Sequence, residues 1–353
     1  MGRLHDTEVQ RLLSLKTPAY AEVADAANRW IVRRAISARE FARLVDKGHS
    51  TMNIFLQGRW DQHMAGTKYA QVNPELLTAR VWEFLQSHPL EPRRKPTDKL
   101  LPTRSAAEIR RLCQAGLFRG AFVILYGPPS AEKSFALENF AAEREAAGHD
   151  DVLYLYCSPR LKPLSLLAML AREAGLGVRS VICWNLMAAL VHEFQSRERL
   201  PLVIADEAQH MTLDTLETLR ELRDRTARPL EGQPGCGLVM AGSHDLYRWF
   251  VDPRQMPRMG QLLSRITHKT QLEGMDEEEV LQIAARELGN GKPAKITAEL
   301  RKKILDGCRD RDFYALDGEN KPAPHDYYSP RKLSIYLDRV KDKLAARKGE
   351  HAA

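Results

Sequence analysis

Two apolar runs, each followed directly by a polar cluster, limit what this chain can fold into. Residues 121–126 (AFVILY) lead into the stretch 127–134 (GPPSAEKS), and residues 202–205 (LVIA) lead into Asp206 and Glu207. A short continuous apolar run is typical of a strand buried on both faces. A tight loop between such a strand and a following helix is an arrangement that binds phosphate groups. The two runs therefore predict an α/β fold with a phosphate site at the carboxyl ends of its strands.

The stretch 127–134 supplies the groups that such a site needs, with one exception. Its backbone amides point at phosphates, Lys133 adds a positive charge, and the Ser134 hydroxyl is a ligand for Mg²⁺. The pattern G-x-x-x-x-G-K-[ST] has glycine where this chain has Glu132, which adds a Cβ and a negative charge. We expect ATP binding to be weakened, to need a partner subunit, or to rely on an adjusted loop. The predicted nucleotide-binding residues are those of the whole loop: Gly127, Pro128, Pro129, Ser130, Ala131, Glu132, Lys133 and Ser134.

The carboxylates after the second run complete the predicted chemistry. Asp206 is placed to hold Mg²⁺ through water, together with Ser134, and Glu207 to polarise the water that attacks the γ-phosphate. A chance match to the loop pattern is the alternative. It is disfavoured because the strand, the loop, the Lys-Ser pair, the helix and the Asp-Glu strand all agree. The sequence thus predicts ATP and Mg²⁺ as ligands and ATP hydrolysis as the reaction.

From residue 103 onward the chain alternates apolar runs with helical segments. Besides the two runs already named, three more are expected to be strands: 152–156, 237–241 and 267–272. Strands that alternate with helices favour a parallel sheet, so we predict a five-stranded parallel sheet within a core spanning residues 103–272. Ser243, just after the fourth strand, then joins the loop and the carboxylates at the edge where ligands bind.

Beyond Leu272 the sequence predicts a helical lid, residues 273–345, and a flexible tail, residues 346–353. The lid helices are expected at three ranges: 276–288, 297–308 and 330–344. The segment 310–328 is polar and contains glycine, proline and aspartate, so we expect a long loop there and no further strands.

Residues 1–88 are expected to form an all-α domain, joined to the core by a proline- and charge-rich linker, residues 89–102. Ser37 and Glu40 have the spacing of a capping box, Gly48 makes a turn, and residues 50–57 form a second short helix. This arrangement is typical of a helix-turn-helix, whose second helix enters the major groove of DNA.

The polar residues of that second helix and two basic residues after it are the predicted DNA contacts. They are Ser50, Thr51, Asn53 and Gln57 toward the bases, and Arg59 and Lys68 toward phosphates. A packing module with a solvated polar face is the alternative for the same residues.

Composition excludes several classes of protein. No stretch approaches the roughly 18 apolar residues of a membrane span, and the charged start has no signal-peptide pattern. The five cysteines contain no C-x-x-C pair, so they are interpreted as reduced thiols and not as metal ligands. A net charge of +7 suits an acidic partner such as nucleic acid. We therefore expect a cytoplasmic protein with no membrane association.

These motifs together resemble those of AAA+ ATPases, and more narrowly the transposition helper (target-selector) ATPases typified by the phage Mu B protein. Besides the loop and the Asp-Glu strand, the resemblance rests on Gly242-Ser243, on residues 263–266 (LSRI) before the fifth strand, and on residues 329–333 (SPRKL). It covers roughly residues 103–344. The family often has Asn or Thr where this chain has Ser243.

The resemblance assigns roles to three further residues. It implies that Ser243 orients water as sensor 1, that Arg265 reaches the γ-phosphate of a neighbouring subunit as an arginine finger, and that Arg331 senses nucleotide from the lid. The alternative for Arg265 is a surface arginine paired with lid acids such as Glu277 or Glu278. For Arg331 the alternative is an exposed arginine without a ligand.

The resemblance also implies a function. Proteins of this type oligomerise with ATP into rings or helical filaments on double-stranded DNA, largely without sequence preference, and recruit or activate a cognate transposase. Arg160 and Lys162, in the loop after the second strand, are candidates to face DNA in such an assembly. A solvated loop is their alternative.

Two other functions remain open at this stage. One is a sequence-specific DNA-binding regulator whose degenerate loop only senses nucleotide, which Glu132 favours and which Glu207 and Arg265 oppose. The other is an origin-recognition-like or secretion-type AAA+ ATPase with a different partner. The predicted helix-turn-helix argues against a secretion-type ATPase.

Overall fold

A computed structural model describes residues 11–12, 15–34, 36–58, 74–88, 94–97, 99–129, 131–177, 180–228, 232–252, 256–289, 296–312, 315 and 323–350. The chain divides into two compact units. The first is made of Met1–Glu91 and Ala168–Ile182, and the second of Pro92–Leu167 and Cys183–Ala353.

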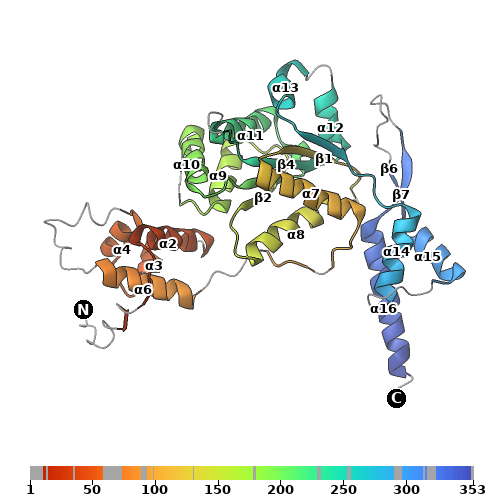
Figure 1. Cartoon of the computed structure of the whole chain (residues 1–353), viewed down its shortest axis with the longest axis horizontal. Coiled ribbons are helices and arrows are strands. Elements are labelled where there is room, and N and C mark those ends of the chain that lie inside the picture. Colours follow the sequence, from red (N-terminus) through yellow and green to blue (C-terminus); the bar gives the residue numbers. More distant parts are fainter. Residues whose placement is uncertain are drawn as a thin grey trace. The chain divides into compact units, whose positions relative to one another are not determined.

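The N-terminal part of the first unit is helical. Its helices are α2 (Tyr20–Arg34), α3 (Ala38–Leu44), α4 (His49–Leu56) and α6 (Pro74–Ser87) (Figure 1). The predicted capping box starts α3: Ser37 Oγ accepts from the backbone N–H of Glu40 at 3.2 Å, and the Glu40 carboxylate accepts from that of Ser37 at 2.7 Å. These bonds satisfy amides that a helix start otherwise leaves unpaired, so this prediction is confirmed.

One apolar cluster holds these helices together. The predicted inner face of α2 contributes Ala24, Ala27 and Ile31, which are buried. The ring of Trp30 lies 5.6 Å from that of Phe41, and its Nε1 donates to the His88 carbonyl at 2.8 Å. Full burial of a large apolar side chain such as Ile31 or Phe41 contributes roughly 1.5–3 kcal/mol.

The second unit contains the predicted five-stranded parallel sheet. Its strands are β1 (Phe122–Tyr126), β2 (Val152–Tyr156), β3 (Leu202–Asp206), β4 (Gly237–Gly242) and β5 (His268–Gln271). They are ordered β2-β3-β4-β1-β5, and each neighbouring pair is parallel. Because β4 lies between β3 and β1, the segments that follow these three strands leave the same edge of the sheet as neighbours.

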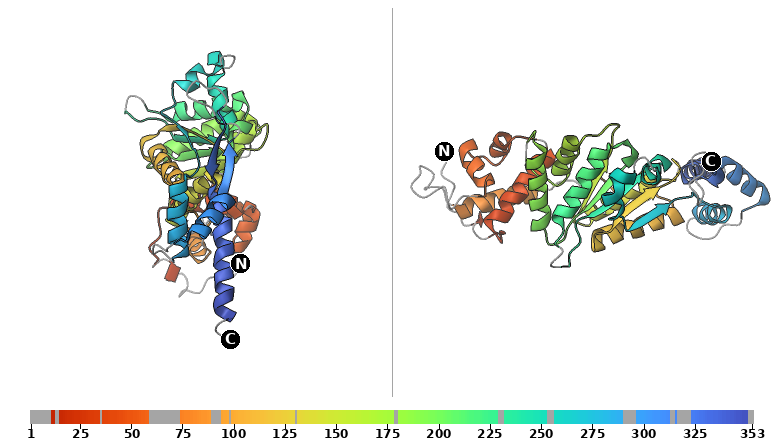
Figure 2. Two further views of the ribbon diagram at one scale, coloured as in Figure 1. Left: turned by 90° about the vertical axis from the view of Figure 1, so that its right-hand side faces the viewer. Right: turned by 90° about the horizontal axis from the view of Figure 1, so that it is seen from above.

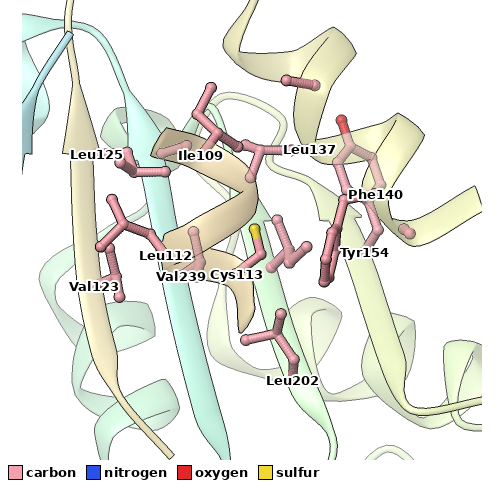
Figure 3. Packing of buried hydrophobic residues seen from close by; sticks show 14 of the residues in the cluster. Ile109, Leu112, Cys113, Val123, Leu125, Leu137, Phe140, Tyr154, Leu202 and Val239 are labelled. Carbon is pink, nitrogen blue, oxygen red and sulfur yellow. The ribbon is translucent and has the colours of Figure 1, made fainter. Parts of the chain in front are cut away.

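Helices precede and connect these strands. They are α7 (Arg104–Arg119), α8 (Lys133–Ala146), α9 (Pro163–Glu173), α10 (Cys183–Ser196), the 3-10 turn η1 (Ala208–His210), α11 (Leu213–Thr226), α12 (His244–Val251) and α13 (Met256–Leu263). Figure 2 shows helices on both sides of the sheet. On one side, Val123 and Leu125 of β1 pack in a buried cluster with α7 and α8 (Figure 3). Phe122 and Ile124, which point the other way because strand residues alternate, are equally buried. This burial on both faces is what the continuous apolar runs predicted.

The C-terminal part of the second unit is the lid. It contains α14 (Glu277–Leu288), α15 (Ala298–Cys308) and α16 (Pro330–Glu350), as predicted, but also two strands, β6 (Arg309–Asp312) and β7 (His325–Tyr328). The expectation of a loop over 310–328 without strands is therefore wrong. The two strands pair antiparallel, with Asp310 opposite Tyr327.

The sequence of this hairpin hides its strands. β6 reads Arg-Asp-Arg-Asp, which lacks the alternation of apolar and polar residues that indicates a strand. Polar side-chain contacts stabilise it instead. The side chain of Arg311 approaches Asp326 across the hairpin at 3.7 Å, and Asp312 is buried against α12.

None of the helices in the described part of the chain combines the length and the apolar character that crossing a bilayer requires.

Candidate nucleotide-binding site

The phosphate-binding loop leaves β1 at Gly127 and enters α8 at Lys133. A Cβ at Gly127 would lie 2.3 Å from the backbone oxygen of Leu272, so only glycine lets the loop pass the end of β5. The Lys133 ammonium donates to the carbonyl oxygens of Gly127 at 2.8 Å and Pro128 at 2.7 Å. Burial lowers the pKa of Lys133 to about 8, against the opposing influence of nearby carboxylates. Ser130 lies outside the described residues.

Glu132 sits in the backbone conformation that the motif reserves for glycine. Its φ is 52°, in the left-handed region, where a side chain costs about 1 kcal/mol. Its Oε2 atom is buried and has no hydrogen-bond partner among the described residues. Burial raises the pKa of Glu132 to about 7, although the charge of Arg331 acts in the opposite direction. The substitution noted in the sequence therefore places a strained, desolvated carboxyl group within the phosphate loop.

The two predicted metal ligands meet at the end of β3. The Asp206 carboxylate is fully buried, and it accepts hydrogen bonds from the Ser134 side chain, from the Tyr154 hydroxyl at 2.9 Å, and from the Glu207 backbone N–H at 2.9 Å. Burial raises the pKa of Asp206, and the bonds from Ser134 and Tyr154 oppose that shift. A carboxylate and a hydroxyl in contact are hard oxygen donors, which suits Mg²⁺ because this ion takes one or two protein oxygens and completes its shell with water and phosphate.

Glu207 begins the η1 turn, also with a left-handed backbone, at a φ of 53°. Its carboxylate Oε2 accepts from Gln209 Nε2 at 2.5 Å and lies 3.9 Å from His210 Nε2. Ser243 follows β4 and caps α12, where its Oγ accepts from the backbone N–H of Asp245 at 3.3 Å. A hydroxyl that accepts in this way still has a proton to donate.

A cavity of about 510 Å³ between the sheet edge and the lid is lined by Pro129, Glu132, Lys133, Ser134 and Glu207, whereas Asp206 and Ser243 are not among its lining residues. Arg331 enters it from α16, so the loop, the carboxylate of Glu207 and the predicted sensor arginine are brought together. The remaining lining residues were not predicted: Lys99, Phe135, Tyr156, Ser334 and Ile335.

One of these, Lys99, lies in what the sequence suggested was only a linker. Phe135 and Tyr156 are large apolar side chains, directly after the loop and at the end of β2, that remain 36% and 57% exposed. Exposed apolar side chains at such positions indicate a contact with a ligand.

Arg265 lies at the opposite edge of the sheet. Two residues later, the backbone N–H of Thr267 donates at 2.8 Å to the carbonyl of Phe122, the first residue of β1, whereas the phosphate loop follows the last residue of that strand. The Nε of Arg265 donates to Asp224 of α11 at 3.2 Å and not to Glu277 or Glu278. Because parallel strands put their two ends at opposite edges, Arg265 cannot serve the phosphates bound by its own loop.

The predicted DNA contacts remain accessible to a partner. In α4 the side chains of Ser50, Asn53 and Gln57 are exposed and Thr51 is partly exposed, while Met52 and Phe55 face the core. Either a DNA-binding face or a solvated face has this pattern, so the assignment stays a prediction. Arg59 and Lys68 lie outside the described residues. In the second unit, Arg160 and Lys162 are exposed beside the buried Leu161.

Strand order, loop and carboxylates together define a P-loop nucleotide-binding domain. Residues 117–250 match the model of a family described as an AAA domain. This part of the chain is accordingly an AAA-type P-loop ATPase domain. No curated protein matches the chain.

Solved structures similar to this chain include the Aeropyrum pernix ORC2 protein with ADPNP and ADP, at 17% identity and a TM-score of 0.46, covering 73% of this chain and 66% of that one. Cdc6p from Pyrobaculum aerophilum matches at 16% identity and a TM-score of 0.48, covering 74% and 65%. The Thermotoga maritima RuvB Holliday junction branch migration motor matches at 14% and 0.37, covering 72% and 67%. The chain thus spans about two thirds of the length of each.

Proposed function

We propose that this chain is a cytoplasmic, ATP-hydrolysing DNA-binding protein of the transposition helper type. It assembles on double-stranded DNA with ATP between subunits and presents that DNA to a cognate transposase. The observation that supports it most is the placement of two groups at opposite edges of one sheet. Lys133 and the carboxylates occupy one edge, and Arg265 occupies the other. A site completed by Arg265 needs a second copy, and head-to-tail copies form rings or filaments.

Within one subunit the chemistry is distributed over residues that line the cavity and over two, Asp206 and Ser243, at the carboxyl ends of the neighbouring strands β3 and β4. Lys133 places its charge on the β- and γ-phosphates, and loop amides hold the remaining phosphate oxygens. Ser134 and Asp206 hold Mg²⁺, which neutralises the charge that develops on the phosphates when it is bound. Glu207 accepts a proton from the attacking water, and Ser243 orients that water. Arg331 senses the γ-phosphate from the lid. The rings of Phe135 and Tyr156 provide faces on which the base stacks.

DNA binding is proposed to rest on phosphate contacts more than on bases. The chain carries a net charge of +7. Arg160 and Lys162 are exposed, and the polar face of α4 adds contacts from the first unit. Since each neutralised phosphate releases counterions, affinity for DNA should fall steeply with salt and depend little on sequence. Retention on DNA that is unchanged at high salt contradicts this part of the proposal.

The decisive experiment is assembly on duplex DNA, followed by sedimentation and negative-stain imaging with and without ATP. Wild type is expected to assemble with ATP, Lys133→Ala to fail, and Glu207→Gln to assemble and persist because it binds ATP without hydrolysing it. Adding the transposase then tests the partner, whose strand-transfer activity is expected to rise only with assembled protein.

One observation favours a second function, a sequence-specific regulator that senses nucleotide without hydrolysing it. Glu132 places a strained carboxyl group where phosphates bind, which is compatible with a site that no longer turns over. Wild type that stays monomeric with ATP and DNA, yet protects one discrete DNA site from cleavage, would establish this alternative.

A further inference from the structure

Gln209, in the turn after β3, uses both ends of its side-chain amide. Its Nε2 donates to the Glu207 carboxylate at 2.5 Å, and its Oε1 accepts from the backbone N–H of Ser243 at 3.2 Å. One side chain therefore ties the predicted proton acceptor after β3 to the turn after β4 that carries the predicted water-orienting serine.

The chemistry of the two partners fixes the orientation of this amide. An ionised carboxylate only accepts hydrogen bonds, and a backbone N–H only donates one. Rotating the amide by half a turn would set oxygen against carboxylate and nitrogen against N–H, which breaks both bonds. Glutamine is thus the side chain of this length that satisfies both partners at once.

The structure also leaves room for this contact. A Cβ at Gly242 would lie 2.2 Å from Gln209 Oε1, far inside van der Waals contact. Gly242 is the last residue of β4, and a Cβ there would also come within 3.1 Å of Leu246, so glycine at this position clears both Gln209 and Leu246.

Without Gln209 the far end of Glu207 has few restraints. Its backbone is fixed: its N–H donates to Asp206 at 2.9 Å, and its carbonyl accepts from the His210 N–H at 3.0 Å. Among the described residues, the carboxylate also lies 3.9 Å from His210 Nε2, which is too far for a hydrogen bond. Glu207 lines the nucleotide cavity, whereas Gln209 and Ser243 are not among its lining residues.

We propose that Gln209 is a positioning residue for hydrolysis, which fixes the Glu207 carboxylate relative to the Ser243 turn so that the two groups act on one water. This inference rests on the proposed ATPase function. Because Gln209 touches no part of the cavity, its loss should lower kcat and leave nucleotide affinity unchanged. A displaced reacting group of this kind lowers a rate by about 10- to 100-fold.

Two variants of the full-length protein separate the two bonds. Gln209→Glu keeps an acceptor for Ser243 but opposes Glu207 with a second carboxylate, while Gln209→Met keeps the volume and removes both bonds. Hydrogen exchange at the Ser243 amide, measured without nucleotide, should stay slow in Gln209→Glu and become fast in Gln209→Met. In both variants kcat should fall, with the ATP dissociation constant within about twofold of wild type. Gln282→Met, an exposed glutamine of α14, is the matched control and should match wild type in every measurement.

The outcomes distinguish two failures. If Gln209→Met hydrolyses ATP at the wild-type rate, or if the Ser243 amide stays protected in it, the role of Gln209 is overturned and the ATPase proposal stands. If wild type does not hydrolyse ATP, the proposed function falls and takes this role with it.

Discussion

The Nε2 atom of His244 lies 2.6 Å from Oδ2 of Asp312, and both side chains are buried. His244 follows Ser243 at the start of α12, and Asp312 ends β6, so the pair joins the nucleotide core to the lid hairpin. The His244 imidazole also lies edge-on to the ring of Tyr126, the residue just before the phosphate loop, with 5.8 Å between the two ring centroids. The lid is thus anchored next to the elements that are predicted to contact phosphate.

Removing one partner of this pair should destabilise the second unit strongly. Asp312→Ala leaves the buried His244 side chain without this hydrogen-bond partner, and a buried polar group left unsatisfied costs about 1–3 kcal/mol. We expect a clear fall in the urea midpoint of unfolding of the full chain. Asp326→Ala, which removes the exposed pair with Arg311 in the same hairpin, is the control and should change little. Equal effects of the two substitutions would show that the buried pair has no special weight.

Replacing Glu132 by glycine should tighten ATP binding. Glycine adopts the left-handed backbone freely and removes the carboxyl group from the loop, so we expect affinity to rise by about tenfold or more. Titration with a fluorescent ATP analogue measures it. Glu132→Ala removes the charge but keeps a Cβ at a φ of 52°, and should gain less. An unchanged affinity in Glu132→Gly would mean that the loop has adapted fully to its glutamate.

Much of the nucleotide site was predictable because its signals are local. Apolar runs marked β1 and β3, and the polar residues that follow them leave the same edge of the sheet because both strands are parallel to β4, which lies between them. The position of Glu132 where the motif has glycine already indicated a left-handed backbone there.

Other parts depend on contacts that no local pattern encodes. The hydroxyl of Tyr154 reaches Asp206 only because β2 pairs with β3 in one register. Gln209 appears as an ordinary polar residue until β4 is placed beside it. The hairpin of β6 and β7 was missed because Asp312, a charged residue, is one of its buried anchors.

The charge of Glu132 should make ATP binding depend on pH. Its pKa is raised from 4.5 to about 7, so the carboxyl group is mostly neutral at pH 6 and mostly anionic at pH 8. An anion in the loop repels polyphosphate, and wild-type affinity should therefore fall as pH rises through about 7. Glu132→Gln keeps the shape but not the titration and serves as the reference, which cancels the titration of ATP itself. The ratio of dissociation constants, wild type over variant, should increase from pH 6 to pH 8, and a constant ratio contradicts the assignment.

Mixing two inactive variants should restore ATP hydrolysis. Glu207→Gln assembles but loses the catalytic carboxylate, and Arg265→Ala loses the finger, but the two groups lie at opposite edges of the sheet. In a mixed assembly, the intact carboxylate of an Arg265→Ala subunit faces the intact arginine of a Glu207→Gln neighbour. Random mixing makes about one interface in four complete, so activity should approach a quarter of wild type. ATPase assays on DNA, at constant total protein, measure this recovery. A mixture no more active than its components would place Arg265 outside the hydrolytic site, because only a residue acting across the interface can be supplied by another copy.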